Sequence, residues 1–131
     1  MTAKQYLSRV RRVDREISAL LRMVEKTRES VTSITQKYDS DGAQSTKDPH
    51  KFDKLAELES LVDEKVDQLV DLKAETLRTI MKLEDNRQRM VLMEYYLEMK
   101  TWEQVAVDLH YSYMHVTRIH GYALREIQKM L

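Results

Sequence analysis

The sequence predicts an all-α protein in which a long antiparallel helical hairpin, coiled-coil-like along its seam, precedes a C-terminal head of short helices. The 131 residues include only two Gly and one Pro, so helix breakers are scarce. Apolar residues recur at steps of three and four with charged residues between them, which is the pattern of helices with one buried face. We expect a hairpin arm over residues 1–84 and a head over residues 85–131.

The first helix is predicted over about residues 2–38. Its apolar residues occupy two positions of a heptad repeat, which indicates a narrow seam against a second helix. One position holds Ala3, Val10, Ile17, Val24, Val31 and Tyr38, and the other holds Tyr6, Val13, Leu20, Thr27 and Ile34.

A polar segment, residues 39–48, lacks any period and is expected to be a mobile loop. Asp48 and Pro49 suit the N-cap and the first position of a second helix that ends near residue 84. Because the two helices have similar lengths and a short connection, they are expected to lie antiparallel. The second helix is expected to turn inward Phe52, Leu55, Leu58, Val62, Val66, Leu69, Leu72, Ile80 and Leu83.

Charge is distributed unevenly although the net charge is zero. Residues 1–38 carry nine Lys and Arg against four acids, and residues 39–84 carry seven against twelve, so the two stretches have net charges of +5 and −5. Residues 85–131 carry six of each sign. Opposite charges on neighbouring helices favour their pairing, and they partly neutralise the basic start within the protein.

Capping residues divide the head into three helices. Asp85 begins a capping box, Thr101 with Gln104 forms another, and Ser112 is a further N-cap. The helix after Thr101 should bury Val105, Ala106 and Leu109. The helix after Ser112 should bury Val116, Ile119, Ala123 and Ile127. Two such helices close in sequence cross steeply, and Ala106 is the small residue expected at the crossing. This is a helix-turn-helix pattern, whose second helix enters the major groove of DNA.

The exposed side of the last helix follows from its angular period of 100° per residue. Arg118 lies opposite the buried face and could pair with guanine O6 and N7, and Thr117 beside it could contact a thymine methyl or a phosphate. Tyr113 lies at the end that points deepest into the groove. The remaining candidates for contacting DNA are Met114, Gly121, Arg125 and Lys129, the last two either as phosphate contacts or as ordinary surface charge.

The segment from Asp85 to Leu131 resembles region 4 of bacterial sigma factors, their C-terminal promoter-binding module. The resemblance rests on Tyr95-Tyr96-Leu97, on Thr101 to Ala106, and on Ser112, Val116, Ile119 and Ala123-Leu124. It is closest to small phage and prophage proteins of Gram-positive bacteria related to the ArpU and RinA late-gene regulators. In such modules promoter contacts come most often from the positions of Tyr113, Met114, Thr117 and Arg118. The family usually has Gly where this chain has His110, at a turn that favours positive φ.

The resemblance implies a sequence-specific DNA-binding regulator of phage late genes that acts in the cytoplasm of a bacterial host cell. Two alternatives stay open: a small terminase subunit that binds packaging DNA, or a helical adaptor that binds host RNA polymerase or a sigma factor without contacting DNA. Double-stranded DNA is therefore the expected partner, with host RNA polymerase as a candidate. A homo-oligomer, with a dimer favoured, is expected because a single amphipathic hairpin buries little apolar surface.

Catalytic chemistry is not expected. There is no Cys, no Gly-rich phosphate loop and no pair of His at metal-ligand spacing, so neither a cofactor nor a metal is predicted. His110, His115 and His120 are interpreted as turn or surface residues, and the acids from Asp63 to Asp71 as a solvated helix face. No apolar run approaches the roughly 20 residues that span a membrane, so no membrane association is expected.

Overall fold

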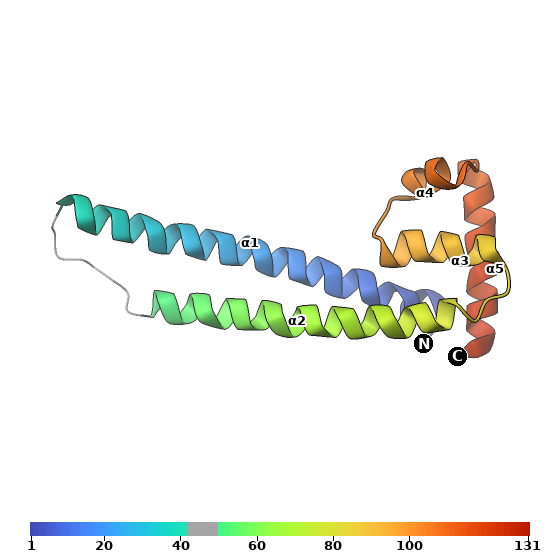
Figure 1. Ribbon diagram of the computed structural model, residues 1–131, viewed down its shortest axis with the longest axis horizontal. Helices are drawn as coiled ribbons and strands as arrows, with labels where there is room; N and C mark the ends of the chain where they lie inside the picture. Colours follow the sequence, from blue (N-terminus) through green and yellow to red (C-terminus); the bar gives the residue numbers. More distant parts are fainter. Residues whose placement is uncertain (42–49) are drawn as a thin grey trace. The chain divides into compact units, whose positions relative to one another are not determined.

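A computed structural model describes the backbone of residues 1–41 and 50–131, and the side chains of residues 1–32 and 50–131. In chain order the elements are α1 (Ala3–Asp41), α2 (Lys51–Ile80), α3 (Asn86–Leu92), the π-helical turn η1 (Met93–Leu97), α4 (Trp102–Leu109) and α5 (Tyr113–Met130) (Figure 1). These described residues contain no strand, which confirms the all-α fold class. None of their helices is both long and apolar enough to cross a membrane.

Helix α1 is longer than predicted. It runs to Asp41, so the loop predicted over residues 39–48 is wrong for its first three residues. No Gly or Pro precedes Gly42, and the polar residues Asp39 and Ser40 are tolerated in the last turn of a helix. Residues 42–49, with the predicted cap at Asp48 and Pro49, lie outside the described residues.

The predicted seam of α1 is buried wherever its side chains are described. The buried members are Ala3, Tyr6, Val10, Val13, Ile17, Val24 and Val31, and Leu20 and Thr27 are half-buried. The heptad pattern therefore identified the inner face of the helix. The side chains of Ile34 and Tyr38 lie outside the described ones, and supercoiling of the helices stays a prediction.

The chain divides into two compact units. One contains Arg15–Gln68, and the other contains Met1–Asp14 together with Leu69–Leu131. In the first of these, the Glu16 carboxylate lies 2.8 Å from Lys65 Nζ, and Arg28 Nη2 lies 2.9 Å from Glu59 Oε1. The later of the two α1 residues thus pairs with the earlier of the two α2 residues, which makes the helices antiparallel. The boundary predicted between residues 84 and 85 stays a prediction.

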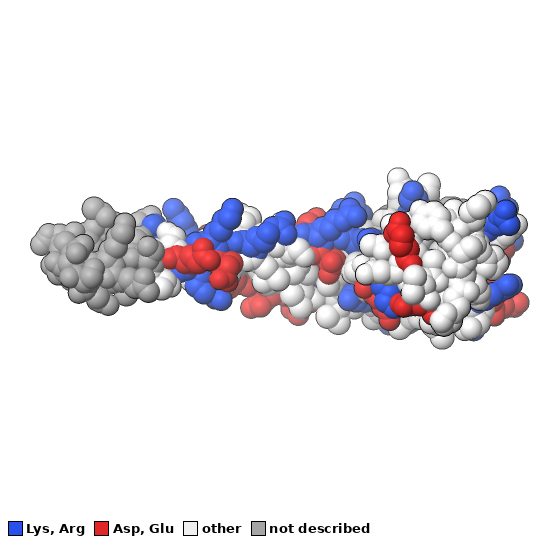
Figure 2. Space-filling view, turned by 90° about the horizontal axis from the view of Figure 1, so that it is seen from above, with Lys and Arg blue, Asp and Glu red and all other residues white. Residues whose placement is uncertain are grey.

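Part of the basic charge of α1 faces solvent. Figure 2 shows Lys and Arg side chains in a row along this helix, and Arg15, Arg22 and Lys26 are exposed. These three have no ion-pair partner among the described side chains. Neutralisation of the basic start by α2 is therefore partial, since Arg28 is paired and this row is not.

The inner face of α2 differs from the prediction at two residues. Phe52 and Val66 are 58% and 40% exposed, so their expected inward orientation is wrong. Ile80 and Leu83 are buried, and the other five predicted residues, Leu55, Leu58, Val62, Leu69 and Leu72, are half-buried. The five half-buried residues cover a narrower arc of α2 than the predicted inner face does. At 100° per residue, Phe52 and Val66 lie at the edge of that arc. Thr76 is fully buried on the inner side.

The first turns of α1 form part of the core in the unit that contains the head. Ala3, Tyr6 and Leu7 pack in one cluster with Ile80, Leu83, Leu92, Tyr96, Ala123 and Ile127. Polar contacts reinforce this packing: Ala3 N–H donates to Gln128 Oε1 at 2.8 Å, and the hydroxyls of Tyr6 and Thr79 lie 2.8 Å apart. The start of the chain, the end of α2 and α5 therefore share one hydrophobic core.

Replacing Leu7 with Ala should destabilise this unit by roughly 2–5 kcal/mol, because the side chain is completely buried and leaves a cavity. Urea unfolding followed by circular dichroism would measure the loss. Leu21→Ala is the matched control, since that leucine lies on the same helix and is 50% exposed. Equal stability of the Leu7 and Leu21 variants would show that the start of α1 does not stabilise the head.

Candidate nucleic-acid interface

Side-chain caps set the start of each helix in the head. Asp85 Oδ1 accepts from the backbone N–H groups of Arg87 (2.8 Å) and Gln88 (3.4 Å), so Asp85 is the N-cap of α3 as predicted. The predicted capping box is wrong in its other half, because the Gln88 side chain makes no bond back to the Asp85 N–H. These bonds, with the nearby Arg87 guanidinium, lower the pKa of Asp85 although its partial desolvation alone would raise it. The carboxylate consequently remains charged where the helix dipole favours negative charge.

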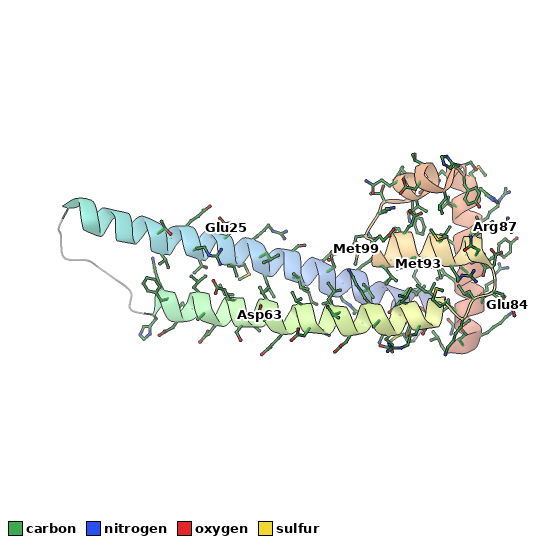
Figure 3. The ribbon with its side chains drawn as sticks, in the orientation of Figure 1. Glu25, Asp63, Glu84, Arg87, Met93 and Met99 are labelled. Carbon is green, nitrogen blue, oxygen red and sulfur yellow. The ribbon has the colours of Figure 1, made fainter. Side chains whose placement is uncertain are left out.

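The inner helix of the head ends in a π-helical turn that was not predicted. In η1 the Glu98 N–H donates to the Met93 carbonyl at 3.0 Å, and the Lys100 N–H donates to the Glu94 carbonyl at 3.1 Å. Met99 follows with a φ of 63°, a conformation uncommon for a non-glycine residue. Figure 3 labels Met93, the first residue of this turn, and Met99, which lies two residues beyond its end. The wider turn shifts the angular period, which a uniform helical pattern cannot reveal.

Two aromatic residues of η1 belong to different packing environments. Tyr96 is almost completely buried in the cluster that includes Leu7 and Ile127. Tyr95 packs against both hydrophobic clusters of the head and stacks on Trp102, with ring centroids 3.7 Å apart. Tyr96 and Trp102 thus pack in different clusters, and Tyr95 is the residue that links them.

Helix α4 begins and ends as the sequence predicts. Thr101 accepts from the Gln104 N–H at 3.2 Å, and the Gln104 side chain accepts from the Thr101 N–H at 2.9 Å, which completes the capping box. His110 ends the helix in the left-handed region, with a φ of 61°. Ser112 then accepts from the His115 N–H at 3.1 Å and begins α5. The sharp turn between the two helices is thus set by local chemistry at both of its ends.

The crossing of α4 and α5 has its own hydrophobic cluster. Val91, Val105, Ala106, Val116 and Ile119 are all buried in it. The four residues predicted to face inward from α5 are its buried residues, since Ala123 and Ile127 join the neighbouring cluster. Ala106 therefore lies among the side chains that join the two helices, as predicted.

Arg11 connects α1 to the end of η1. Its guanidinium lies over the Tyr95 ring, 4.1 Å from the centroid, in a cation–π contact. The same group donates to the Tyr95 carbonyl and, at 3.4 Å, to the Lys100 carbonyl. Carbonyls at the end of a helix lack intrahelical partners, so Arg11 satisfies groups that the π-helical turn leaves open.

Lys100 joins η1 to α4 through three carboxylates. Its Nζ lies 2.5 Å from Asp108 Oδ2, 2.5 Å from Glu94 Oε1 and 3.3 Å from Glu98 Oε2. The hydrogen bonds to Asp108 and Glu94 raise the pKa of Lys100, and Lys100 lowers the pKa of Asp108. Lys100 and Asp108 therefore remain charged, and the cluster links η1 to α4 through ion pairs.

His120 was interpreted as a turn or surface residue, and this is wrong. It is half-buried on α5 with its Nε2 2.7 Å from the Tyr96 hydroxyl, and its ring lies 4.5 Å from that of Trp102 between centroids. Burial lowers the pKa of His120 to about 4, with a smaller contribution from the Lys4 charge. Its neighbours come from η1 and α4, so helical spacing along α5 could not reveal them. His115, also half-buried, packs edge-on against Tyr111.

All seven residues predicted to contact DNA are exposed. They are Tyr113, Met114, Thr117, Arg118, Gly121, Arg125 and Lys129. Arg118 has no hydrogen-bond or ion-pair partner among the described residues, whereas Lys129 Nζ lies 3.0 Å from Glu126 Oε1. The Thr117 hydroxyl donates to the Tyr113 carbonyl at 2.9 Å. Open space surrounds the Gly121 Cα where a side chain would project.

Tyr122 extends this face and was not among the predicted residues. It is 56% exposed and lies one turn beyond Arg118, with the Arg125 guanidinium 5.6 Å from its ring centroid. The i, i+4 spacing from Arg118 was a signal that could have identified it. Within the described part of the chain, no three His, Asp or Glu side chains gather as metal ligands would.

Comparison with known families identifies the module that this geometry forms. Residues 85–129 match the family model of sigma-70, region 4. No curated protein and no solved structure matches the chain. The head is therefore similar to sigma-70 region 4, a family of helix-turn-helix DNA-binding domains. The match covers the last third of the chain, and it includes the caps, the turn at His110 and the exposed face of α5.

Ala106→Leu should destabilise the head by about 1–3 kcal/mol, because a larger side chain overpacks the crossing of α4 and α5. Thermal unfolding followed by circular dichroism would measure the effect. Val107→Leu is the control, since Val107 is the next residue of the same helix and is 72% exposed. If both variants melt like the wild type, Ala106 does not lie at a tight contact.

Acidification should destabilise the protein through His120. Its pKa is 6.5 in an unperturbed chain and about 4 here, so the unfolded state takes up the proton first as the pH falls. The contribution of neutral His120 to the free energy of unfolding is fully present above pH 6.5 and is lost as the pH falls toward 4. By pH 5 the free energy of unfolding should have fallen by about 2 kcal/mol.

Urea unfolding at pH 7.5 and pH 5.0 would measure this loss in the wild type and in His120→Gln. The variant keeps a polar partner for the Tyr96 hydroxyl and does not titrate, so it should lose about 2 kcal/mol less than the wild type between the two pH values. Identical losses in the two proteins would show that His120 titrates normally in the folded state.

Proposed function

We propose that this protein is a sequence-specific DNA-binding transcriptional regulator of phage late genes, and that α5 enters the major groove. One observation supports the proposal above the others: the residues of α5 divide into a buried set that packs in the two clusters of the head and an exposed set that includes Arg118, which has no partner among the described residues. An unpaired, exposed Arg on the groove-facing side of a helix-turn-helix is suited to a bidentate bond with guanine.

The rest of the exposed face suits weaker and more varied contacts. Tyr113 and Tyr122 present hydroxyls for phosphates or base edges, and Met114, 67% exposed, presents an apolar surface that suits a thymine methyl. The bare backbone at Gly121 allows close approach of the DNA backbone. Arg125 is suited to a phosphate contact, whereas Lys129 would first have to leave Glu126.

Such a regulator would act in the cytoplasm of a bacterial host, with host RNA polymerase as a further partner and with the protein as a homo-oligomer, a dimer being favoured. No cofactor and no catalytic step belong to this proposal. A small terminase subunit would use the same head on packaging DNA.

One observation favours the alternative function, an adaptor that binds polymerase without contacting DNA. Val107 and Met114 are exposed apolar residues on α4 and α5, and Val107 borders a shallow cavity of about 360 Å³ beside Lys100 and Glu103. Such a surface could bind an apolar side chain of another protein.

Arg118→Ala tests the proposal. We expect it to weaken binding to a selected DNA site by about 1–3 kcal/mol and binding to scrambled DNA far less, with folding unchanged because the side chain is exposed. Fluorescence anisotropy at two salt concentrations would measure both affinities, after selection of bound fragments from random DNA.

Lys129→Ala is the comparison variant on the same helix. If Lys129 contacts phosphate, its loss should weaken both DNAs alike and reduce the salt dependence by about one unit. Equal losses on both DNAs for Arg118→Ala would exclude a base contact by this residue. Failure of the wild-type protein to bind any selected DNA would favour the adaptor that binds polymerase.

A further inference from the structure

Helix α2 carries a second apolar stripe that faces solvent. Val70, Leu77 and Met81 are 60%, 39% and 55% exposed, and Ala74 between them is exposed as well. Steps of four, three and four place these residues on one side of the helix, and the Met81 N–H continues the helical bonding to the Leu77 carbonyl at 2.9 Å. We call this set the outer stripe.

The outer stripe differs from ordinary exposed apolar residues. Single apolar side chains are common on protein surfaces, but three turns with heptad spacing form the pattern of a contact between helices. An adjacent side of α2, roughly 110° around the helix at 100° per residue, is already occupied, since Thr76 and Ile80 are fully buried. This part of α2 therefore has one apolar face inside the protein and another without a partner among the described residues.

Charged residues follow one edge of the outer stripe. Asp71 comes directly after Val70, and Arg78 and Lys82 come directly after Leu77 and Met81. All three charged side chains are exposed, and none has an ion-pair partner among the described side chains. The edge is consequently acidic at its N-terminal end and basic at its C-terminal end.

We propose that the outer stripe binds a second copy of this chain, with the two α2 helices antiparallel about a twofold axis. In that register Val70 faces Met81 of the second copy, and Ala74 faces Leu77. Corresponding edges of antiparallel helices face each other, so each Asp71 lies beside Arg78 and Lys82 of the other copy. The stripe therefore carries the complement of its own apolar and charged pattern, as a twofold contact between identical chains requires.

The size of the outer stripe sets the strength of the contact. Three turns of one helix against three turns of another bury less than the roughly 1,200 Å² that marks the lower end of stable interfaces. Dimerisation should therefore depend on protein concentration. This inference rests on the proposed function only for the homodimer, whose interface it supplies, and it is independent of DNA binding because the stripe lies on α2 and includes no residue of the DNA-contacting face.

Charge exchange tests the dimer and its register. Sedimentation equilibrium of the full chain should show a monomer–dimer equilibrium for the wild type. Asp71→Arg or Arg78→Asp alone places like charges together twice in each dimer, and each should raise the dissociation constant roughly tenfold or more. The double variant carrying both changes should recover most of the wild-type affinity, because opposite charges face each other again.

Apolar variants provide a second, independent measurement. Val70→Ser should weaken the dimer, whereas Val107→Ser, which changes an exposed Val on α4, should leave it unchanged. Melting temperatures like that of the wild type would show that these exposed substitutions leave the fold intact.

Three results would overturn the proposal. One is a wild-type protein that stays monomeric at every concentration. Another is a dimer that neither charge reversal weakens. The third is a double variant as weak as the single ones, which would exclude the antiparallel register.

Discussion

Packing of the first turns of α1 into the head is the interaction on which the rest of this unit depends. Leu7 and Tyr6 occupy the same cluster as Tyr96 and Ile127, although about ninety residues or more separate them in the chain. Arg11, one turn further along α1, satisfies carbonyls at the end of η1. The segment that matches the sigma-70 region 4 family therefore relies on residues outside the match for part of its core. Helix α5, which carries the candidate DNA contacts, packs through its buried face against the start of α1 and the end of α2.

Local chemistry explains why so much of this architecture could be predicted. The seam of α1, the caps at Asp85, Thr101 and Ser112, and the buried face of α5 all depend on residues within a few positions of one another. His110 adopts positive φ where only two residues, His110 and Tyr111, connect the end of α4 to the N-cap Ser112. Short-range patterns of this kind are visible in one sequence.

The features that could not be predicted depend on contacts between distant segments. The π-helical turn has the same apolar pattern as an ordinary helix, and its open carbonyls are satisfied by Arg11 from the other end of the chain. His120 looks like a surface residue on α5 until Tyr96 and Trp102 are brought beside it. Phe52 and Val66 fit the apolar period of α2, but the half-buried face is narrower than that period implies. The exposure of the candidate DNA contacts, in contrast, follows from the period of α5 alone.

The distribution of charge within the head explains how a segment with six positive and six negative residues can still present a face suited to DNA. Three of its carboxylates, those of Glu94, Glu98 and Asp108, surround the single ammonium of Lys100. Asp85 caps α3 beside Arg87, and Glu126 pairs with Lys129. The acids are thus concentrated at the junction of η1 with α4 and at helix ends, while Arg118 and Arg125 have no ion-pair partner among the described residues. The net negative charge near Lys100 disfavours phosphates there relative to the exposed face of α5. The ion pairs that stabilise the head therefore also make α5 the more favourable side for a polyanion.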